Sequence, residues 1–251
     1  MCLPPTYSMA RTIIVIPCFN EARRLSAEAF RDFAANWPDG SFLFVDDGSS
    51  DDTFEILSAI WHSIPAQCQI LRLPQNAGKA EAVRRGMLRA FESNPDYAGF
   101  WDADLATPLD AVPLFERIFR ERPETDVVLG ARVKLLGRNI ERRAARHYLG
   151  RVFATAVGAT LGMNVYDSQC GAKLFRNTAR VRGAFDTPFL ARWIFDVEIL
   201  VRLIKRSAGP VPVSLYELPL PVWRDVAGSK LRMTDFVRAI YDLARIQRTV
   251  K

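Results

Sequence analysis

The sequence lacks several patterns that mark common classes of protein. Its four cysteines include no Cys-x-x-Cys pair and its two histidines stand apart, so we expect no zinc site and interpret the cysteines as reduced thiols. No apolar run reaches the roughly 18 residues that a membrane-spanning helix needs. Residues 1–10 lack the basic start and apolar core of a signal peptide, and we expect a disordered leader there. The protein is therefore expected in the cytosol or at the cytosolic face of a membrane.

Two glycine-rich phosphate-binding loops are also missing. A Rossmann turn requires Gly-x-Gly-x-x-Gly after the first strand, but here that strand runs into Pro17–Glu21, which contains no glycine, and no Walker loop occurs. Bare backbone cannot wrap a pyrophosphate at this turn, so side chains must bind a nucleotide instead. The net charge is +6 without long basic runs or Arg-Gly repeats, which favours a phosphorylated substrate or an anionic membrane over nucleic acid.

The order of the expected elements indicates one α/β domain at residues 11–232, followed by an amphipathic helix at 233–251. The 251 residues are 49% hydrophobic, which is enough for one full core. Strand-like runs alternate with helical spacing, which predicts a mostly parallel central sheet flanked by helices. Strands are expected at 11–17, 42–45, 69–73, 97–101, 126–130, 173–176 and 211–220. Helices are expected at 21–37, 54–61, 78–93, 110–120, 140–163, 195–206 and 233–249.

Two aspartates follow the strand that ends at Trp101. Asp102 and Asp104 lie two residues apart, so both carboxylates point the same way if the chain stays extended. Like charges this close raise each other's pKa, and a divalent cation removes the conflict. Hard oxygen ligands suit Mg²⁺ or Mn²⁺, and proteins often hold Mg²⁺ with one or two carboxylates and the phosphates of a substrate. The pair alone is weak evidence, because two solvated loop carboxylates have the same sequence.

Polar residues follow three of the expected strands, at 17–21, 46–53 and 102–104. Ligands of parallel sheets bind beyond the carboxyl ends of the strands, so we expect these segments to meet at one crevice. Asp46 and Asp47 could accept hydrogen bonds from uracil N3–H or ribose hydroxyls, and Phe19 could lie against a base. Alternatively, the two aspartates only cap the next helix.

Four motifs, in this order, resemble those of the family-two glycosyltransferases: Ile14–Glu21, Val45–Thr53, Gln75–Lys79 and Asp102–Asp104. The second half resembles the branch that contains the dolichyl-phosphate glucosyl- and mannosyltransferases, and it is closer to the glucosyl members, through Asp167–Phe175, Trp193–Leu200 and Gly228–Leu231. The resemblance extends from Arg11 to about Leu243. It implies the single-domain, nucleotide-sugar-binding fold called glycosyltransferase type A.

The resemblance also implies a reaction and a set of site residues. The reaction is an inverting transfer of a sugar from a nucleotide sugar, with UDP-glucose favoured, to polyprenyl phosphate, and Mg²⁺ or Mn²⁺ is the implied cofactor, bound by Asp102 and Asp104. The expected catalytic residues are Asp102, Asp104, Arg132 and Lys173. The expected nucleotide-binding residues are Pro17, Phe19, Glu21, Asp46, Asp47, Lys79 and Asp102. The expected acceptor-binding residues are Arg142, Arg143, Arg146, Gln169, Ser229 and Lys230.

The acceptor decides the mechanism. A phosphate is already an anion at pH 7, so it needs cations but no general base, and arginine forks match its geometry. A sugar hydroxyl requires a carboxylate base, for which Asp167 and Asp196 are the candidates. The alternative from another class is a nucleotide-sugar-binding protein without catalysis, and the intact pair of aspartates argues against it.

Several features leave more than one interpretation open. The helix expected at 233–249 is amphipathic and basic, so it could lie on a membrane surface or pack on the domain. The apolar stretch 152–163 could dip into a membrane interface, and the arginines between 138 and 151 could bind the acceptor or simply be solvated. Ala106 stands where many mannosyl relatives have a glutamine, so no third metal ligand is expected there. The sequence does not indicate an oligomeric state.

Overall fold

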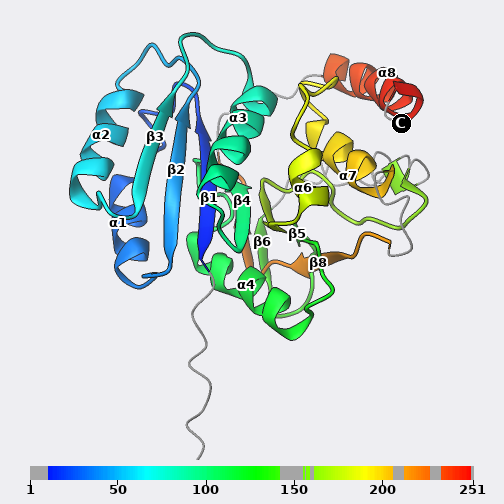
Figure 1. The fold of residues 1–251 in the computed structure, drawn as a ribbon, viewed down its shortest axis with the longest axis horizontal. Coiled ribbons are helices and arrows are strands. Elements are labelled where there is room, and N and C mark those ends of the chain that lie inside the picture. The colour runs from blue at the N-terminus through cyan, green and yellow to red at the C-terminus, as the bar shows by residue number, and fades with distance from the viewer. Residues whose placement is uncertain are drawn as a thin grey trace, which may run out of the picture.

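A computed structural model describes residues 11–141, 155, 157–158, 161–205, 212–226 and 233–249. A seven-stranded sheet in the order β3-β2-β1-β4-β7-β5-β8 forms its centre (Figure 1). The strands are β1 (Thr12–Cys18), β2 (Gly40–Asp46), β3 (Cys68–Arg72), β4 (Tyr97–Trp101), β5 (Val127–Ala131), β7 (Ala172–Arg176) and β8 (Leu215–Pro219). β7 is antiparallel to β4 and β5, and the other neighbours pair in parallel. The expected mostly parallel sheet is confirmed.

The central strands lie in the middle because both of their faces are apolar. Ile14, Val15 and Ile16 of β1 are fully buried, and β4 is buried along its whole length. Such continuous apolar runs are typical of strands that are covered on both sides. The antiparallel direction of β7 could not be expected from its residues, because a local hydrophobic pattern carries no information about strand direction.

Helices cover the two faces of the sheet and so complete three layers (Figure 1). On one face, the core includes Phe30, Leu57 and Phe115. These side chains come from α1 (Ala27–Ala35), α2 (Thr53–Ser63) and α4 (Val112–Glu121), which follows the short 3₁₀ turn Leu109–Ala111. On the other face, the core is formed by side chains of α3 (Lys79–Glu92), α6 (Ala179–Gly183), α7 (Phe195–Lys205) and α8 (Met233–Thr249).

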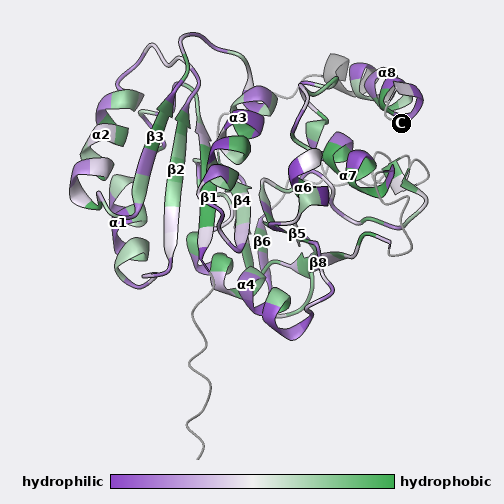
Figure 2. Ribbon diagram, in the orientation of Figure 1, coloured by the Kyte–Doolittle hydropathy of each residue, from purple (hydrophilic) through white to green (hydrophobic). Residues whose placement is uncertain are grey.

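The C-terminal helix packs on the domain. α8 lies against α7 and buries Ala239, Leu243 and Ile246, and hydrophobic and hydrophilic residues both occur along it in Figure 2. Of the two alternatives for this helix, packing on the domain is therefore the one that the structure shows. Within the stretch 152–163, Val157 and Leu161 are buried in the same core. Among the described residues, we find no helix that could span a bilayer.

Some element boundaries differ from expectation. The helix expected from residue 21 begins at Ala27, because the Ser26 side chain caps it by accepting from the Ala29 N–H group. The helix expected at 140–163 does not begin at Ile140, which lies in the short strand β6 (Asn139–Glu141). This strand pairs in parallel with β9 (Val222–Arg224), which we did not expect. Residues 142–154 lie outside the described part of the chain.

Candidate functional site

The carboxyl ends of β1, β2 and β4 meet at one edge of the sheet, as the parallel pairing requires. The turn after β1 interlocks there with the turn after β2. The Glu21 N–H group donates to Thr53 Oγ1 at 2.8 Å, and the Ser50 N–H group donates to Asn20 Oδ1 at 2.9 Å. These contacts join the segments at 17–21 and 46–53, and the parallel pairing of β1 with β4 brings the segment at 102–104 to the same edge.

Asp46 and Asp47 are buried and organise the surrounding loops. Asp47 accepts from the N–H groups of Ala77 and Gly78, both at 2.8 Å, and so fixes the entry to α3. Asp46 accepts from the Ser49 N–H group at 2.9 Å, and its second oxygen lies 3.3 Å from Arg72 Nε. The nucleotide contacts expected of these two carboxylates stay predictions, since both serve the protein backbone in this arrangement.

Asp102 and Asp104 stand at the end of β4. The Asp102 N–H group donates to the Gly171 carbonyl at 3.0 Å, and Asp104 Oδ1 accepts from the Ala106 N–H group at 3.1 Å. Burial and the neighbouring charge of Asp102 raise the pKa of Asp104. Glu21 faces the same pair, and burial together with the charges of Asp104 and Asp102 outweighs its contact with Arg24 and raises its pKa too. One of its oxygens, Oε2, is buried without a hydrogen-bond partner. The three carboxyls therefore form an electrostatically unfavourable group that a cation would stabilise.

A lysine partly compensates this negative charge. Lys79 Nζ lies 2.5 Å from Asp102 Oδ1. Desolvation opposes the charged form of Lys79, but the carboxylates of Asp102 and Asp196 outweigh it and raise its pKa. Lys79 is thus held as a cation at the mouth of the site, where a phosphate could reach it.

Lys173 is fully buried beneath this site. Its ammonium donates to Asp196 Oδ1 and to the Cys170 carbonyl, both at 2.6 Å, and lies 5.3 Å from the centre of the Phe100 ring. A lysine in this position cannot touch a substrate directly. It holds Asp196, which in turn faces Lys79, so charges of alternating sign run from the core to the surface.

Arg132 is held by a carboxylate. Its Nε and Nη2 atoms donate to the two oxygens of Asp167 at 2.6 and 2.7 Å. Asp167 is itself positioned by Glu217, which accepts its N–H group at 2.8 Å. Burial disfavours the charged guanidinium, but Asp167 and the more distant Asp102 outweigh it and raise the pKa of Arg132. Arg132 therefore remains a fixed positive charge near the aspartates.

The remaining expected residues divide into two groups. Phe19 is exposed, and Pro17 and Gln169 are half-buried. Arg142, Arg143, Arg146, Ser229 and Lys230 lie outside the described residues, so their acceptor-binding role stays a prediction.

Two residues that we did not single out belong to the site. A Cβ atom on Gly171 would stand 1.9 Å from Asp102 Oδ2, so only glycine lets the carboxylate take this position. Arg192 is exposed and lies over Gly78, where its Nη2 atom is 3.0 Å from the position of an added Cβ atom. Gly171 lies within the segment Asp167–Phe175 that carried the resemblance, and Arg192 directly precedes the segment Trp193–Leu200. Neither residue type indicates a contact across the fold, so the sequence contained no signal for them.

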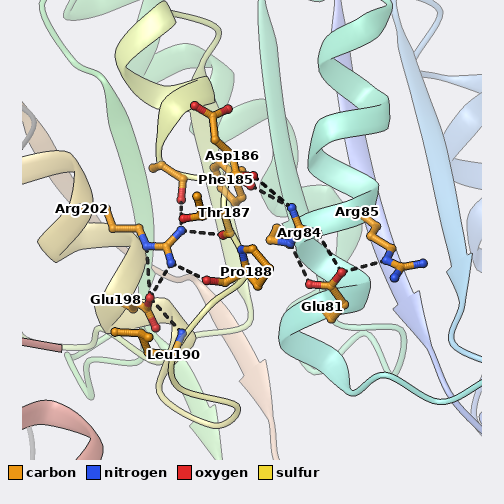
Figure 3. Close-up of polar contacts among 11 residues, drawn as sticks. Glu81, Arg84, Arg85, Phe185, Asp186, Thr187, Pro188, Leu190, Glu198 and Arg202 are labelled. Carbon is orange, nitrogen blue, oxygen red and sulfur yellow. Dashed lines mark hydrogen bonds and ion pairs between the residues drawn. The ribbon is translucent and has the colours of Figure 1, made fainter. Parts of the chain in front are cut away.

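A buried ion pair fixes the loop that presents Arg192 (Figure 3). Glu198 accepts from the N–H groups of Leu190 and Ala191 at 3.0 and 2.9 Å, and it also accepts from Arg202 at 2.7 Å. Arg202 donates in addition to the carbonyls of Ala184, Thr187 and Pro188. From α3, Arg84 reaches the Phe185 carbonyl at 3.2 Å. The loop before α7 is thereby held on both sides.

The site fits a divalent cation with a substrate phosphate, though not as a cage of protein ligands alone. Among the described residues there is no group of three or more His, Cys, Asp or Glu side chains arranged for a metal. Asp102 and Asp104 do provide two hard oxygen ligands, and burial together with the charge of Asp102 raises the pKa of Asp104. This donor set is typical of Mg²⁺ sites in which phosphates and water complete the coordination.

The sequence matches the glycosyl transferase family 2 over residues 13–182. It is similar to the dolichyl-phosphate β-glucosyltransferase of Saccharomyces cerevisiae, with 31% identity over 93% of this chain and 73% of that protein. It is also similar to the dolichyl-phosphate β-glucosyltransferase ALG5C of Trichomonas vaginalis, with 29% identity over 94% of this chain and 70% of that protein.

Among solved structures, the fold is similar to glucosyl-3-phosphoglycerate synthase from Mycobacterium tuberculosis, determined with Mn²⁺, UDP-glucose and phosphoglyceric acid. The TM-score is 0.66 and the identity 19%, over 96% of this chain and 80% of the other. At this identity the likeness extends to the fold, and it confirms the expected architecture.

Proposed function

Because the chain belongs to glycosyltransferase family 2, we propose that it transfers a hexose from a nucleotide sugar to a polyprenyl phosphate with inversion at the anomeric carbon. The acceptor class is supported by the relatives that act on dolichyl phosphate. Their names also support glucose as the sugar, and we propose UDP-glucose as the donor. The proposed place of action is the cytosolic face of a membrane, with the protein bound peripherally.

One observation carries the choice of acceptor. A hydroxyl acceptor needs a free carboxylate base, and the two candidates are both engaged. Asp167 binds the fork of Arg132 through both of its oxygens, and Asp196 binds the buried ammonium of Lys173. A phosphate acceptor brings its own negatively charged oxygen and needs no base, so the arrangement favours it.

We propose a separate role for each residue of the site. Asp102 and Asp104 would hold Mg²⁺ or Mn²⁺, which would supply positive charge to the leaving diphosphate. Lys79 places its ammonium beside the same phosphates. Arg132 contributes a fixed charge near the donor, and Lys173 is a positioning residue that acts through Asp196. On the donor side we propose that Phe19 stacks on the base and that Pro17, Glu21, Asp46 and Asp47 line the nucleoside pocket.

The acceptor side of the proposal includes residues that the structure does not describe. We propose that Gln169 and the cationic residues expected there surround the acceptor phosphate: Arg142, Arg143, Arg146 and Lys230, with Ser229. Arginine is suited to this role because its fork binds two phosphate oxygens at once.

The experiment that tests this function begins with calorimetric titration of UDP, GDP and UDP-glucose, each with and without Mn²⁺. We expect metal-dependent binding of UDP and UDP-glucose, which Asp104→Asn abolishes and Asp32→Asn, an exposed change on α1, leaves intact. Transfer is then measured to a polyprenyl phosphate and to a simple glycoside with free hydroxyls. Transfer only to the glycoside would refute the acceptor, and metal-independent binding would refute the role of Asp104. Donor binding without any transfer or slow hydrolysis would indicate a non-catalytic binding protein.

A further inference from the structure

A turn with two exposed leucines projects near the site. It follows β5, whose carboxyl end lies at the same edge of the sheet as those of β1, β2 and β4, because β5 and β4 are both antiparallel to β7. Leu136 is fully exposed, and Leu135 is 51% exposed. A single exposed leucine is common, but two adjacent ones at a tip are not explained by packing within this domain.

The geometry of this turn is fixed. The Arg138 N–H group donates to the Leu135 carbonyl at 3.1 Å, which closes a β-turn. Gly137 has a φ of +79°, as the third position of a type II turn requires, and Leu136 therefore occupies the apex. Apex positions of turns normally carry small or polar residues. The backbone thus holds a large apolar side chain at its most protruding point.

The charged residues of the turn segment itself are all basic. The segment Arg132–Asn139 contains three basic residues, Arg132, Lys134 and Arg138, and no acidic residue. Lys134 and Arg138 flank the leucines on either side and are exposed. The base of the segment is tied to the site, because Arg132 pairs with Asp167 at 2.6 Å.

We propose that the turn formed by Leu135 and Leu136 inserts into the interface of an anionic lipid bilayer, with Lys134 and Arg138 binding its headgroups. A narrow apolar tip between basic side chains fits between lipid headgroups. It does not fit a stable protein partner, because such an interface buries about 800 Å² on each side. Insertion here would bring the edge of the sheet that carries the site to the membrane surface. This inference rests on the proposed peripheral binding to a membrane and names the segment that makes the contact, which requires no acceptor to be present.

Flotation of the full chain with vesicles tests the inference directly. With vesicles of phosphatidylcholine and phosphatidylglycerol, we expect the wild-type protein to float. The double variant Leu135→Ser/Leu136→Ser should bind about tenfold or more weakly, because burial of one leucine is already worth about this factor. Lys134→Ser/Arg138→Ser should weaken binding on the order of fivefold per charge and reduce its dependence on salt.

A matched control is available near the opposite edge of the sheet. Trp61 is a large apolar residue that is 42% exposed near the end of α2, away from the edge that carries the site. Trp61→Ser should float like the wild-type protein. Equal flotation of the leucine double variant and the wild-type protein would overturn the inference, and so would self-association of the wild-type protein that the double variant abolishes without any binding to vesicles.

An activity measurement separates this inference from the proposed function. The leucine double variant should retain transfer to a short, water-soluble prenyl phosphate and lose transfer to a long polyprenyl phosphate embedded in vesicles. If no prenyl phosphate of either kind is an acceptor for the wild-type protein, the proposed function fails while flotation still decides the membrane contact. If the double variant loses both activities equally, the turn belongs to the site itself and the inference is wrong.

Discussion

The position of Asp102 depends on a residue that has no side chain. Gly171 precedes β7, and its carbonyl accepts the Asp102 N–H group at 3.0 Å. Antiparallel pairing of β7 with β4 brings the two backbones together at this point. The Asp102 carboxylate fills the space that a Cβ atom would need. Gly171 therefore acts on the site in two ways, by binding the Asp102 backbone and by leaving room for the Asp102 carboxylate.

Gly171→Ala should impair the site more than the fold. The added methyl group must displace the Asp102 carboxylate, which can swing away at little cost because it is the end of a side chain. We expect metal-dependent UDP binding to fall at least tenfold, measured by calorimetry, with a small change in melting temperature.

Gly99→Ala is the contrasting variant for this prediction. Gly99 lies inside β4, where a Cβ atom would stand 2.2 Å from the Lys173 carbonyl. Backbone cannot yield as a side chain does, so this variant should lose several degrees in melting temperature. Equal loss of stability in the two variants would show that Gly171 serves the sheet rather than Asp102.

The segment between α6 and α7 is held by charged groups that are themselves buried. Glu198 is fully buried and Arg202 nearly so, and together they bind backbone groups from Ala184 to Ala191 (Figure 3). Buried ion pairs of this kind are costly to break but specify one arrangement. Their effect here is to set Arg192 over the entry to α3, next to Lys79.

Arg192→Gln should weaken binding of the nucleotide diphosphate without affecting stability. Arg192 is exposed and lies over Gly78, the residue before Lys79, so its charge would add to the field at the proposed phosphate site. We expect a three- to tenfold loss of UDP affinity, on the order of 1 kcal/mol for one exposed charge. The loss should decrease at high salt, and Arg192→Lys should restore most of the affinity if charge is what matters.

Arg202→Met, in contrast to Arg192→Gln, should lower the stability of the folded protein. It leaves Glu198 buried without its cation, and breaking such a pair costs about 3–5 kcal/mol. Chemical denaturation should report this loss of stability. Arg202→Met combined with Glu198→Gln should be more stable than Arg202→Met alone, since no buried charge is then unpaired. An unchanged free energy of unfolding in Arg202→Met would contradict the role assigned to this pair.

The stability of the whole molecule should depend on pH through the crowded carboxyls. The pKa values of Asp104 and Glu21 are raised in the folded state, so their ionisation costs stability. The two carboxyls in their protonated forms stabilise the folded state. This stabilisation is fully present below the unfolded pKa of about 4 and is lost as the pH rises through the folded pKa values. Without metal, Asp104→Asn should therefore be more stable than the wild-type protein at pH 7, and the difference should shrink towards pH 4.

Addition of Mn²⁺ should make the wild-type protein more stable than Asp104→Asn at pH 7. A ligand that binds only the folded state stabilises it in proportion to its affinity, and the wild-type protein retains both carboxylates. Thermal unfolding at several pH values, with and without Mn²⁺, measures both effects. A wild-type protein that Mn²⁺ does not stabilise at pH 7, with or without UDP, would remove the metal from the proposed mechanism.

Local patterns in the sequence were sufficient for most of the architecture. Continuous apolar runs such as Thr12–Ile16 predict buried strands, and their alternation with helices predicts the parallel sheet. The same rule placed the polar segments after β1, β2 and β4 at one edge, and the structure confirms this. Buried strands, their parallel order and the shared edge can be predicted from the sequence because they depend on residues that are neighbours in sequence and on the right-handed connection of parallel strands.

Other features arise from residues that are distant in sequence. The direction of β7, the space at Gly171, the burial of Lys173 against Asp196 and the packing of α8 on α7 each join segments that no local pattern relates. Lys173 shows the difference most clearly, because the family resemblance placed it among the catalytic residues without indicating its burial, whereas the fold encloses it completely. Residue type and order thus indicated the class of reaction. Burial and charge pairing exist only once the chain is folded, and they determine which of the candidate side chains are accessible at the site and which are enclosed beneath it.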